Sequence, residues 1–205
     1  MKKFQLTRLM VLSVLAAAVS GCAPLLLGGA MVGTGLVITD RRTTGTQVED
    51  QAIELKSAAR TRELATLGRV NADSYNRIVL LTGEVPAAAD RVAVERAVAG
   101  VENVRSVVNE LVVADKLSVG SRSADAVLAG KIKATLVDAK DVQANAFKVV
   151  ADRGAIYLMG RVTEREAQRG ADIARSVSGV QKVVRVFEIL TEAELAALSP
   201  KSATR

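Results

Sequence analysis

The chain has 205 residues and a formal net charge of +6; 49% of its residues are apolar, only 2% are aromatic and none is histidine. Without histidine, the chain lacks the commonest general base and the commonest zinc ligand, and no serine or cysteine can be activated by an imidazole. The composition therefore argues against an enzyme, and we expect no catalytic, cofactor or metal site.

The chain begins with the layout of a secretory signal. Basic residues precede an apolar run, 9–19, that is too short to span a bilayer and stay there. The run ends in Val19-Ser-Gly-Cys22, which resembles the lipobox of bacterial lipoproteins. This resemblance implies a signal peptide over 1–21, lipidation of Cys22 and, because alanine rather than aspartate follows, transport to the outer membrane. Cleavage by an ordinary signal peptidase, which leaves a free thiol, is the alternative.

A glycine-rich tether is predicted over residues 22–45. Cys22 is the only cysteine, so no intramolecular disulfide can form and core packing alone must stabilise the domains. The apolar stretch 23–39 is short and weakly helical for a membrane span, although a second span remains the alternative. Asp40-Arg41-Arg42 closes the stretch, either as a solvated linker or as a contact to lipid headgroups.

The first predicted domain spans residues 46–113 and opens with a helix. Thr46-Gln-Val-Glu49 fits a capping box. The predicted apolar face of this helix consists of Val48, Ala52, Leu55 and Ala59. The expected elements that follow are a hairpin of strands 69–75 and 78–85 with a turn at Asn76-Arg77, a helix over 87–99 that ends at a left-handed Gly100, and a strand over 104–113.

A second domain, 123–190, repeats this order after a linker, 114–122. The strand Ile78-Val-Leu-Leu-Thr-Gly-Glu-Val85 returns as Ala155-Ile-Tyr-Leu-Met-Gly-Arg-Val162. The expected elements are a helix capped by Ser123 or Asp125 that runs to about Val137, strands 147–151 and 155–162 joined by a turn at 152–154, a helix from the capping box Thr163-Glu-Arg-Glu166 to Gly179, and a strand over 182–190.

The fold class that these elements predict is α+β. A strand, helix, strand unit needs a right-handed crossover, so each domain should be a three-stranded mixed sheet with two helices on one face, in the order αββαβ. We interpret Gly83 and Gly160 as sites either of close backbone approach or of a bulge within their strands. A further capping pattern, Thr191-Glu-Ala-Glu194, predicts a short helix in the C-terminal tail, 191–205.

Two groups of segments resemble a known family. Ile156-Tyr-Leu-Met-Gly-Arg-Val-Thr-Glu-Arg-Glu-Ala167, with Ala171-Asp-Ile-Ala174 and Val177-Ser-Gly-Val180, is similar to the BON domain, and 69–75 with 78–83 resembles a first copy. Together with the lipobox, the chain resembles the dual-BON outer-membrane lipoproteins. This resemblance implies a non-enzymatic protein of the periplasmic leaflet that binds anionic phospholipid through its second BON domain and supports envelope integrity.

Charge is divided unevenly between the two predicted domains. Residues 46–113 carry 8 basic and 10 acidic side chains, whereas residues 114–205 carry 15 and 11. A basic surface attracts an anionic partner. Export excludes nucleic acid, and the scarcity of aromatic stacking platforms agrees. An anionic phospholipid membrane surface is the expected partner that remains.

The expected membrane contact lies on the first helix of the second domain. Leu128, Ile132 and Leu136 form an i, i+4 stripe, and Lys131 and Lys133 fall about 100° to either side of it. We expect Ile132 and Leu136 in the core. The predicted phospholipid-binding residues are Val127, Leu128, Lys131 and Lys133.

The resemblance also implies that the lipid-binding helix can carry an aromatic residue where Val127 stands. The alternative function is a protein-interaction scaffold. It docks on an outer-membrane assembly or cell-envelope protein and has no intrinsic lipid recognition.

Overall fold

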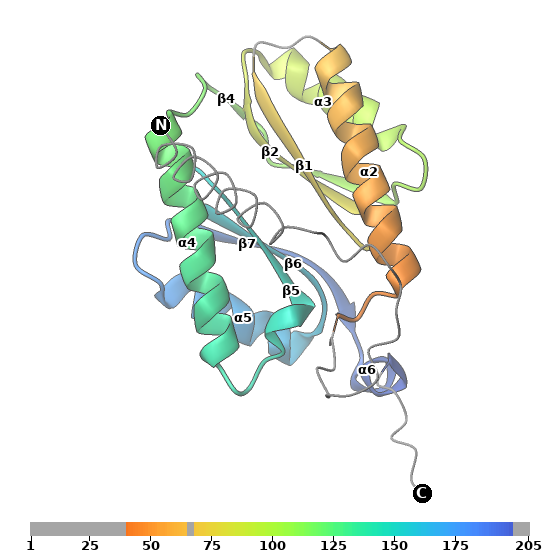
Figure 1. Cartoon of the computed structure of the whole chain (residues 1–205), viewed down its shortest axis with the longest axis vertical. Coiled ribbons are helices and arrows are strands. Elements are labelled where there is room, and N and C mark those ends of the chain that lie inside the picture. Colours follow the sequence, from red (N-terminus) through yellow and green to blue (C-terminus); the bar gives the residue numbers. More distant parts are fainter. Residues whose placement is uncertain (1–39, 65–67, 199–205) are drawn as a thin grey trace, which may run out of the picture. The chain divides into compact units, whose positions relative to one another are not determined.

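The order helix, strand, strand, helix, strand occurs twice along the chain, as predicted (Figure 1). The structure is a computed structural model that describes residues 40–64 and 68–198. The predicted signal peptide, Cys22 and the predicted tether up to residue 39 lie outside the described residues. Both repeats belong to one unit of the chain, Ile38–Arg205.

The first repeat is an α+β module with a mixed sheet. Its elements are α2 (Thr44–Glu63), β1 (Arg69–Tyr75), β2 (Ile78–Val85), α3 (Ala88–Ala99), β3 (Ser106–Asn109) and β4 (Val112–Val113). Strand β1 pairs antiparallel with β2, while β3 and β4 pair parallel with it. The single strand predicted over 104–113 is interrupted, because Asn109 Oδ1 accepts a hydrogen bond from Leu111 N at 3.1 Å and Leu111 turns into the core.

The second repeat has the same topology. Its elements are α4 (Val119–Asp138), the 3-10 turn Ala144–Ala146, β5 (Phe147–Asp152), β6 (Ala155–Thr163), α5 (Glu164–Ser176), β7 (Lys182–Leu190) and the terminal α6 (Glu192–Leu198). Strand β6 is central, antiparallel to β5 and parallel to β7. The predicted hairpins, the last strand and the short terminal helix are therefore confirmed.

A buried aspartate on the first helix of each repeat holds the hairpin turn. The turn residues Asn76 and Arg77 have φ of 50° and 66°, as two-residue type I′ turns require. Their amides donate to the Asp50 carboxylate at 2.8 Å. In the second repeat, the amides of Arg153 and Gly154 donate to Asp125 at 2.9 Å.

The start of α4 differs from the prediction. Ser118, not Ser123 or Asp125, caps the helix, because its hydroxyl accepts a hydrogen bond from Ser121 N at 3.1 Å. Helix α4 thus takes up the last residues of the predicted linker, and Asp125 is free to bind the hairpin turn instead.

Helix α2 also differs from the prediction, in its cap and in its buried face. Thr43, rather than Thr46, is the N-cap. The predicted apolar face is wrong, since Leu55 is 74% exposed and Val48 is exposed as well. The residues that α2 buries are Asp50, Ile53, Ser57 and Thr61. The helix is turned so that Asp50 reaches the hairpin, and this contact outweighs the burial of two apolar side chains.

The glycines behave as predicted in the strands but not at both helix ends. A Cβ on Gly83 would lie 2.0 Å from Arg69 O, and one on Gly160 would lie 2.3 Å from Ala146 O, which confirms close backbone approach at both. Gly100 has φ of −82° and is not left-handed; the left-handed residue of that loop is Asn103. Gly179 is left-handed, with φ of 101°, but α5 ends at Ser176, earlier than predicted.

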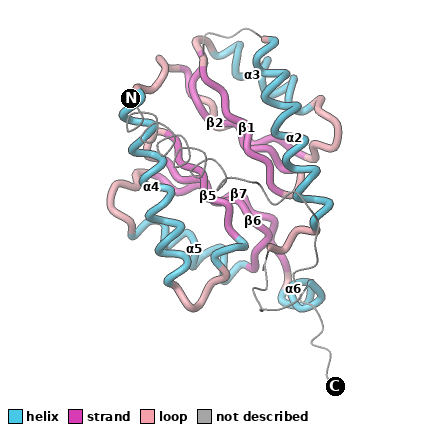
Figure 2. Tube along the Cα trace, viewed as in Figure 1, coloured by secondary structure: helices cyan, strands magenta, loops and turns pink. Residues whose placement is uncertain are grey.

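Each sheet packs its helices on one face and meets the other sheet with the opposite face. Figure 2 shows the strands of the two repeats facing one another, with α2, α3, α4 and α5 on the outside. In β2, Val79 and Leu81 join the helix-side core, whereas Leu80 points to the second repeat. The cluster between the sheets consists of Tyr75, Leu80, Tyr157, Met159 and Val186.

Residues 40–42 tie the two repeats together instead of forming a solvated linker or a headgroup contact. The Arg41 guanidinium donates to both carboxylate oxygens of Glu166 at 2.7 Å, and the adjacent Arg42 donates to Asp50 at 2.8 Å and lies over the Tyr75 ring. Burial opposes ionisation of Glu166, but hydrogen bonds from Arg41 and Thr163 outweigh it and lower the Glu166 pKa. These residues, which belong to the predicted tether, are therefore fixed to both repeats.

Candidate functional site

The outer face of α4 is apolar along most of its length. Leu128, Ile132 and Leu136 are buried against the sheet, as the i, i+4 stripe requires. The opposite face exposes Val127, with 58% of its surface accessible, and Val137. The small residues between them, Gly130 and Ala134, are also exposed. The outer face of α4 therefore consists of small apolar side chains.

Cations flank this face on both sides. Arg122, Lys131 and Lys133 are exposed, and none of them forms an ion pair within the described residues. Helix α4 has two acidic residues, but Asp125 is buried and bound to the hairpin turn, and Asp138 is the last residue. The exposed surface of α4 before Asp138 therefore carries positive charge without a balancing carboxylate.

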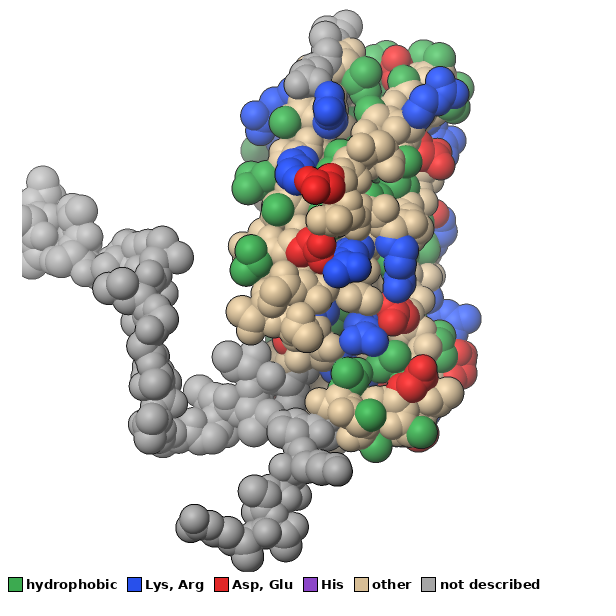
Figure 3. All heavy atoms as spheres, turned by 90° about the vertical axis from the view of Figure 1, so that its right-hand side faces the viewer, with side chains coloured by type: hydrophobic (Ala, Val, Ile, Leu, Met, Phe, Trp, Pro, Cys, Tyr) green, Lys and Arg blue, Asp and Glu red, His purple; other side chains and the backbone are tan. Residues whose placement is uncertain are grey.

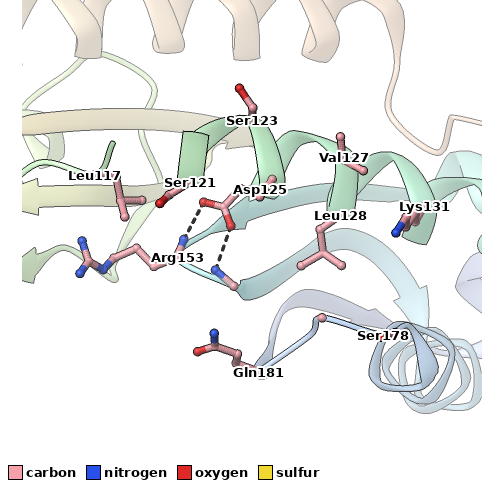
Figure 4. Close-up of a pocket in the computed structure, with 13 residues that line it drawn as sticks. Leu117, Ser121, Ser123, Asp125, Val127, Leu128, Lys131, Arg153, Ser178 and Gln181 are labelled. Carbon is pink, nitrogen blue, oxygen red and sulfur yellow. Dashed lines mark hydrogen bonds between the residues drawn. The ribbon is translucent and has the colours of Figure 1, made fainter. Parts of the chain in front are cut away.

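Three of the four predicted site residues, Val127, Leu128 and Lys131, line one cleft of about 820 Å³. Figure 4 shows Val127 and Leu128 pointing to different sides of α4, with Leu128 directed toward the strands. Leu128 is only 8% exposed, so the expectation that it is an exposed contact is wrong: it belongs to the buried stripe and contributes only to the wall of the cleft.

Lys133 lies on the other flank of α4. It lines a separate hollow of about 320 Å³ together with Arg42, Phe147 and Lys148. The structure therefore does not bring Lys131 and Lys133 into one pocket. Instead, the two lysines border the apolar outer face from opposite sides, where both can meet a flat anionic surface.

Arg153 is a site residue that sequence reasoning missed. It comes from the β5–β6 turn and lines the same cleft as Lys131, while its Nη1 lies 3.4 Å from Glu84 in the first repeat. The pKa of Glu84 is lowered, because hydrogen bonds from Arg69 and Arg153 outweigh the burial that opposes ionisation. Burial raises the pKa of the neighbouring Asp152. No local sequence pattern links this turn to α4.

Over residues 40–64 and 68–198, no cluster of three or more Cys, Asp or Glu side chains is arranged to hold a metal ion. Among the helices of this same part of the chain, none combines the length and the apolar character needed to cross a bilayer.

Comparison with known proteins matches both repeats. The family model described as "BON domain" matches residues 50–115 and 124–191. Outer membrane lipoprotein DolP of Haemophilus influenzae is 39% identical over 173 residues, which cover 83% of this chain and 89% of that protein. The 21 kDa hemolysin of Actinobacillus pleuropneumoniae is 33% identical over 151 residues, which cover 72% of this chain and 78% of that protein.

Among solved structures, the chain is similar to CdsD, a structural protein of the type III secretion system of Chlamydia trachomatis. The match has 13% identity and a TM-score of 0.30, and it covers 77% of this chain and 99% of that chain. A likeness this low carries no argument about the fold.

Both repeats match the same family model, and the similarity to DolP extends over most of the chain. The relationship places the protein at the outer membrane as a lipid-anchored protein. Cleavage after residue 21 and acylation of Cys22 stay predictions, because both residues lie outside the described part. The chain belongs to the BON-domain family and is a DolP-like, dual-BON outer-membrane lipoprotein.

Proposed function

We propose that the second BON domain binds anionic phospholipid through the outer face of α4, and that this contact supports the integrity of the envelope at the periplasmic leaflet. The observation that carries the proposal is the outer face of α4, on which Val127 and Val137 are exposed. Lys131 and Lys133 border this face, and neither has an ion-pair partner within the described residues. The role is one of binding and needs no catalysis.

The physical basis is that of a helix lying in the plane of a membrane interface. Apolar side chains such as Val127 enter the boundary between headgroups and acyl chains, while lysine ammonium groups stay at the phosphates. Each lysine near an anionic surface contributes about 1 kcal/mol. Because valine offers little apolar area, the contact is weak alone. A lipid anchor on the same chain keeps α4 at a high local concentration near the membrane.

Binding to vesicles should depend on lipid charge and on salt. We expect residues 23–205, which lack the acyl anchor, to co-sediment with phosphatidylglycerol vesicles but not with phosphatidylcholine vesicles, and to be released by 0.5 M salt because screening weakens exposed charge contacts. Equal binding to both vesicle types, or binding that salt leaves unchanged, would contradict an electrostatic contact.

An aromatic residue at position 127 should strengthen the contact. We expect Val127→Phe to tighten binding to anionic vesicles by about fivefold, because the larger side chain buries more apolar area in the interface. Val92→Phe is the matched control, since Val92 on α3 is 55% exposed and Val127 is 58% exposed. A similar gain from both variants would show that added hydrophobicity acts anywhere on the surface.

The alternative is a scaffold that docks on an outer-membrane assembly or cell-envelope protein. One observation favours it: α2 leaves Val48 and Leu55 exposed. Figure 3 shows the side of the molecule on which α2 and α3 lie in Figure 1, where apolar, basic and acidic side chains are interspersed. If residues 23–205 co-sediment with neither anionic nor neutral vesicles, this alternative is favoured.

A further inference from the structure

A second basic cleft lies away from the outer face of α4. Its volume is about 540 Å³, and three segments of the chain contribute a cation to it. Arg62 comes from the last turn of α2, Lys116 from the segment between the repeats, and Arg122 from the first turns of α4. Sequence spacing alone does not predict that these three side chains meet.

The positive charge of this cleft is not neutralised within the described residues. No acidic side chain is among the described residues that line it. Arg62, Lys116 and Arg122 take part in none of the ion pairs of residues 40–64 and 68–198. By contrast, many other cations of the two repeats have a carboxylate partner, such as Arg41 with Glu166.

A fourth cation, Arg69, lines the same cleft and is held in place from behind. Its Nε and Nη2 donate to Glu84 at 3.1 and 3.0 Å, and Nη2 also donates to Asp152. Nη1 has no hydrogen-bond partner in the described part of the chain. The guanidinium is therefore fixed in orientation and keeps one nitrogen available for a ligand.

Cations that converge without a counter-charge repel one another, and a cleft lined by one sign of charge concentrates ions of the other sign. A bound anion would remove this repulsion. Guanidinium groups match the oxygen geometry of phosphate, to which they donate paired hydrogen bonds, and a lysine adds a point charge. The combination of Arg62, Lys116 and Arg122 around a fixed Arg69 is therefore suited to a phosphate-bearing anion.

We propose that this cleft binds a phosphate-bearing anion, in a site that both BON domains and the segment between them form together. The site goes beyond the proposed function, because Arg62 and Lys116 lie outside α4 and Arg62 belongs to the first BON domain. Leu117 lines both this cleft and the cleft of Lys131, so the site lies next to the proposed membrane contact. The phosphate comes either from a lipid headgroup or from a soluble compound.

The first test uses sodium pyrophosphate as the probe and the chain of residues 23–205, which contains every described element. NMR follows the backbone amides during the titration, and we expect saturable shifts at Gly68 and Leu117. Arg62→Gln with Lys116→Gln should weaken the apparent affinity at least about tenfold, because each lost charge-assisted hydrogen bond costs about a factor of ten. Both side chains are exposed and unpaired, so the variant should fold normally.

The matched control is Arg96→Gln with Lys140→Gln, which removes the same charge from two exposed cations outside the cleft. We expect this control to bind pyrophosphate like the unchanged chain. The proposal is overturned if the unchanged chain shows no saturable shifts, or if both double variants lose affinity equally.

Vesicles that contain phosphatidic acid separate the two sources of phosphate. If the Arg62 and Lys116 variant binds these vesicles more weakly than the control variant, the ligand of the cleft is a lipid headgroup. If both variants bind the vesicles equally while only the cleft variant loses pyrophosphate, the ligand is soluble. Both results uphold the site, and neither depends on the lysines of α4.

Discussion

Replacement of Asp50 by alanine is expected to lower the free energy of unfolding by about 3 to 5 kcal/mol. Asp50 is 2% exposed. Its carboxylate accepts a hydrogen bond from Ser74 Oγ at 2.7 Å, and hydrogen bonds from the amides of Asn76 and Arg77 and from Arg42 Nη1 at 2.8 Å. Alanine leaves these donors without an acceptor and releases the hairpin turn. Urea unfolding followed by circular dichroism measures the loss.

The effect of Asp50 should also depend on pH. Burial opposes ionisation, but the hydrogen bonds from Arg77, Ser74 and Arg42 outweigh it and lower the Asp50 pKa. Since the folded-state pKa lies below the unfolded value of about 4, the stabilisation is present above that pH and is lost as the pH falls through the folded-state pKa. The difference between the two chains should therefore shrink in acid. Asp115→Ala, at an exposed position, is the control, and a pH-independent difference would contradict the account.

Replacement of Gly83 by alanine is expected to destabilise the first BON domain by about 3 kcal/mol or more. Gly83 has φ of +118°, and an added Cβ would lie 2.0 Å from Arg69 O in the paired strand. Backbone atoms cannot move aside as a flexible side chain can, so β1 must separate from β2 at this position. The change in the midpoint of urea unfolding measures this cost.

Gly130→Ala is the matched control, because an added Cβ there meets nothing within 4 Å. Gly130 lies inside α4, where alanine is the better helix former, so the variant should be more stable by about 0.5 to 1 kcal/mol. If Gly83→Ala were as harmless as Gly130→Ala, the close approach of β1 and β2 at Gly83 would be wrong.

The hairpins and the crossover topology could be predicted because local chemistry and repetition agree there. The Gly83 strand and the Gly160 strand occur in matching contexts, and each is followed by a helix and a further strand. The capping box at Thr163 was also correct, since Glu166 is three residues on and the two side chains satisfy each other's backbone amides.

The face of α2 could not be predicted because tertiary contacts decide it. Apolar spacing favoured a face with Val48 and Leu55, but the helix buries Asp50 instead, since this carboxylate holds a turn that lies more than 20 residues further along the chain. The helical period identifies which residues share a face. It does not tell which face meets the sheet when the buried side is partly polar.

In the candidate site, too, some features follow from helical geometry and others depend on tertiary packing. Helical geometry correctly placed Lys131 and Lys133 on either side of the buried stripe, and Val127 outside it. Leu128 was placed in the stripe correctly, but its expected exposure as a lipid contact was wrong, because it is buried with the rest of the stripe. Arg153 joins Lys131 only through the packing of a hairpin turn on α4, which no spacing in the sequence encodes.

The central claim is that the outer face of α4 recognises anionic phospholipid, and charge reversal on that face tests it most directly. Residues 23–205 carrying Lys131→Glu and Lys133→Glu are co-sedimented with phosphatidylglycerol vesicles. The control carries Lys56→Glu and Arg96→Glu, an equal change of charge at exposed positions of the first BON domain. We predict that the α4 variant loses vesicle binding while the control keeps most of it; equal binding by the two variants would contradict the account.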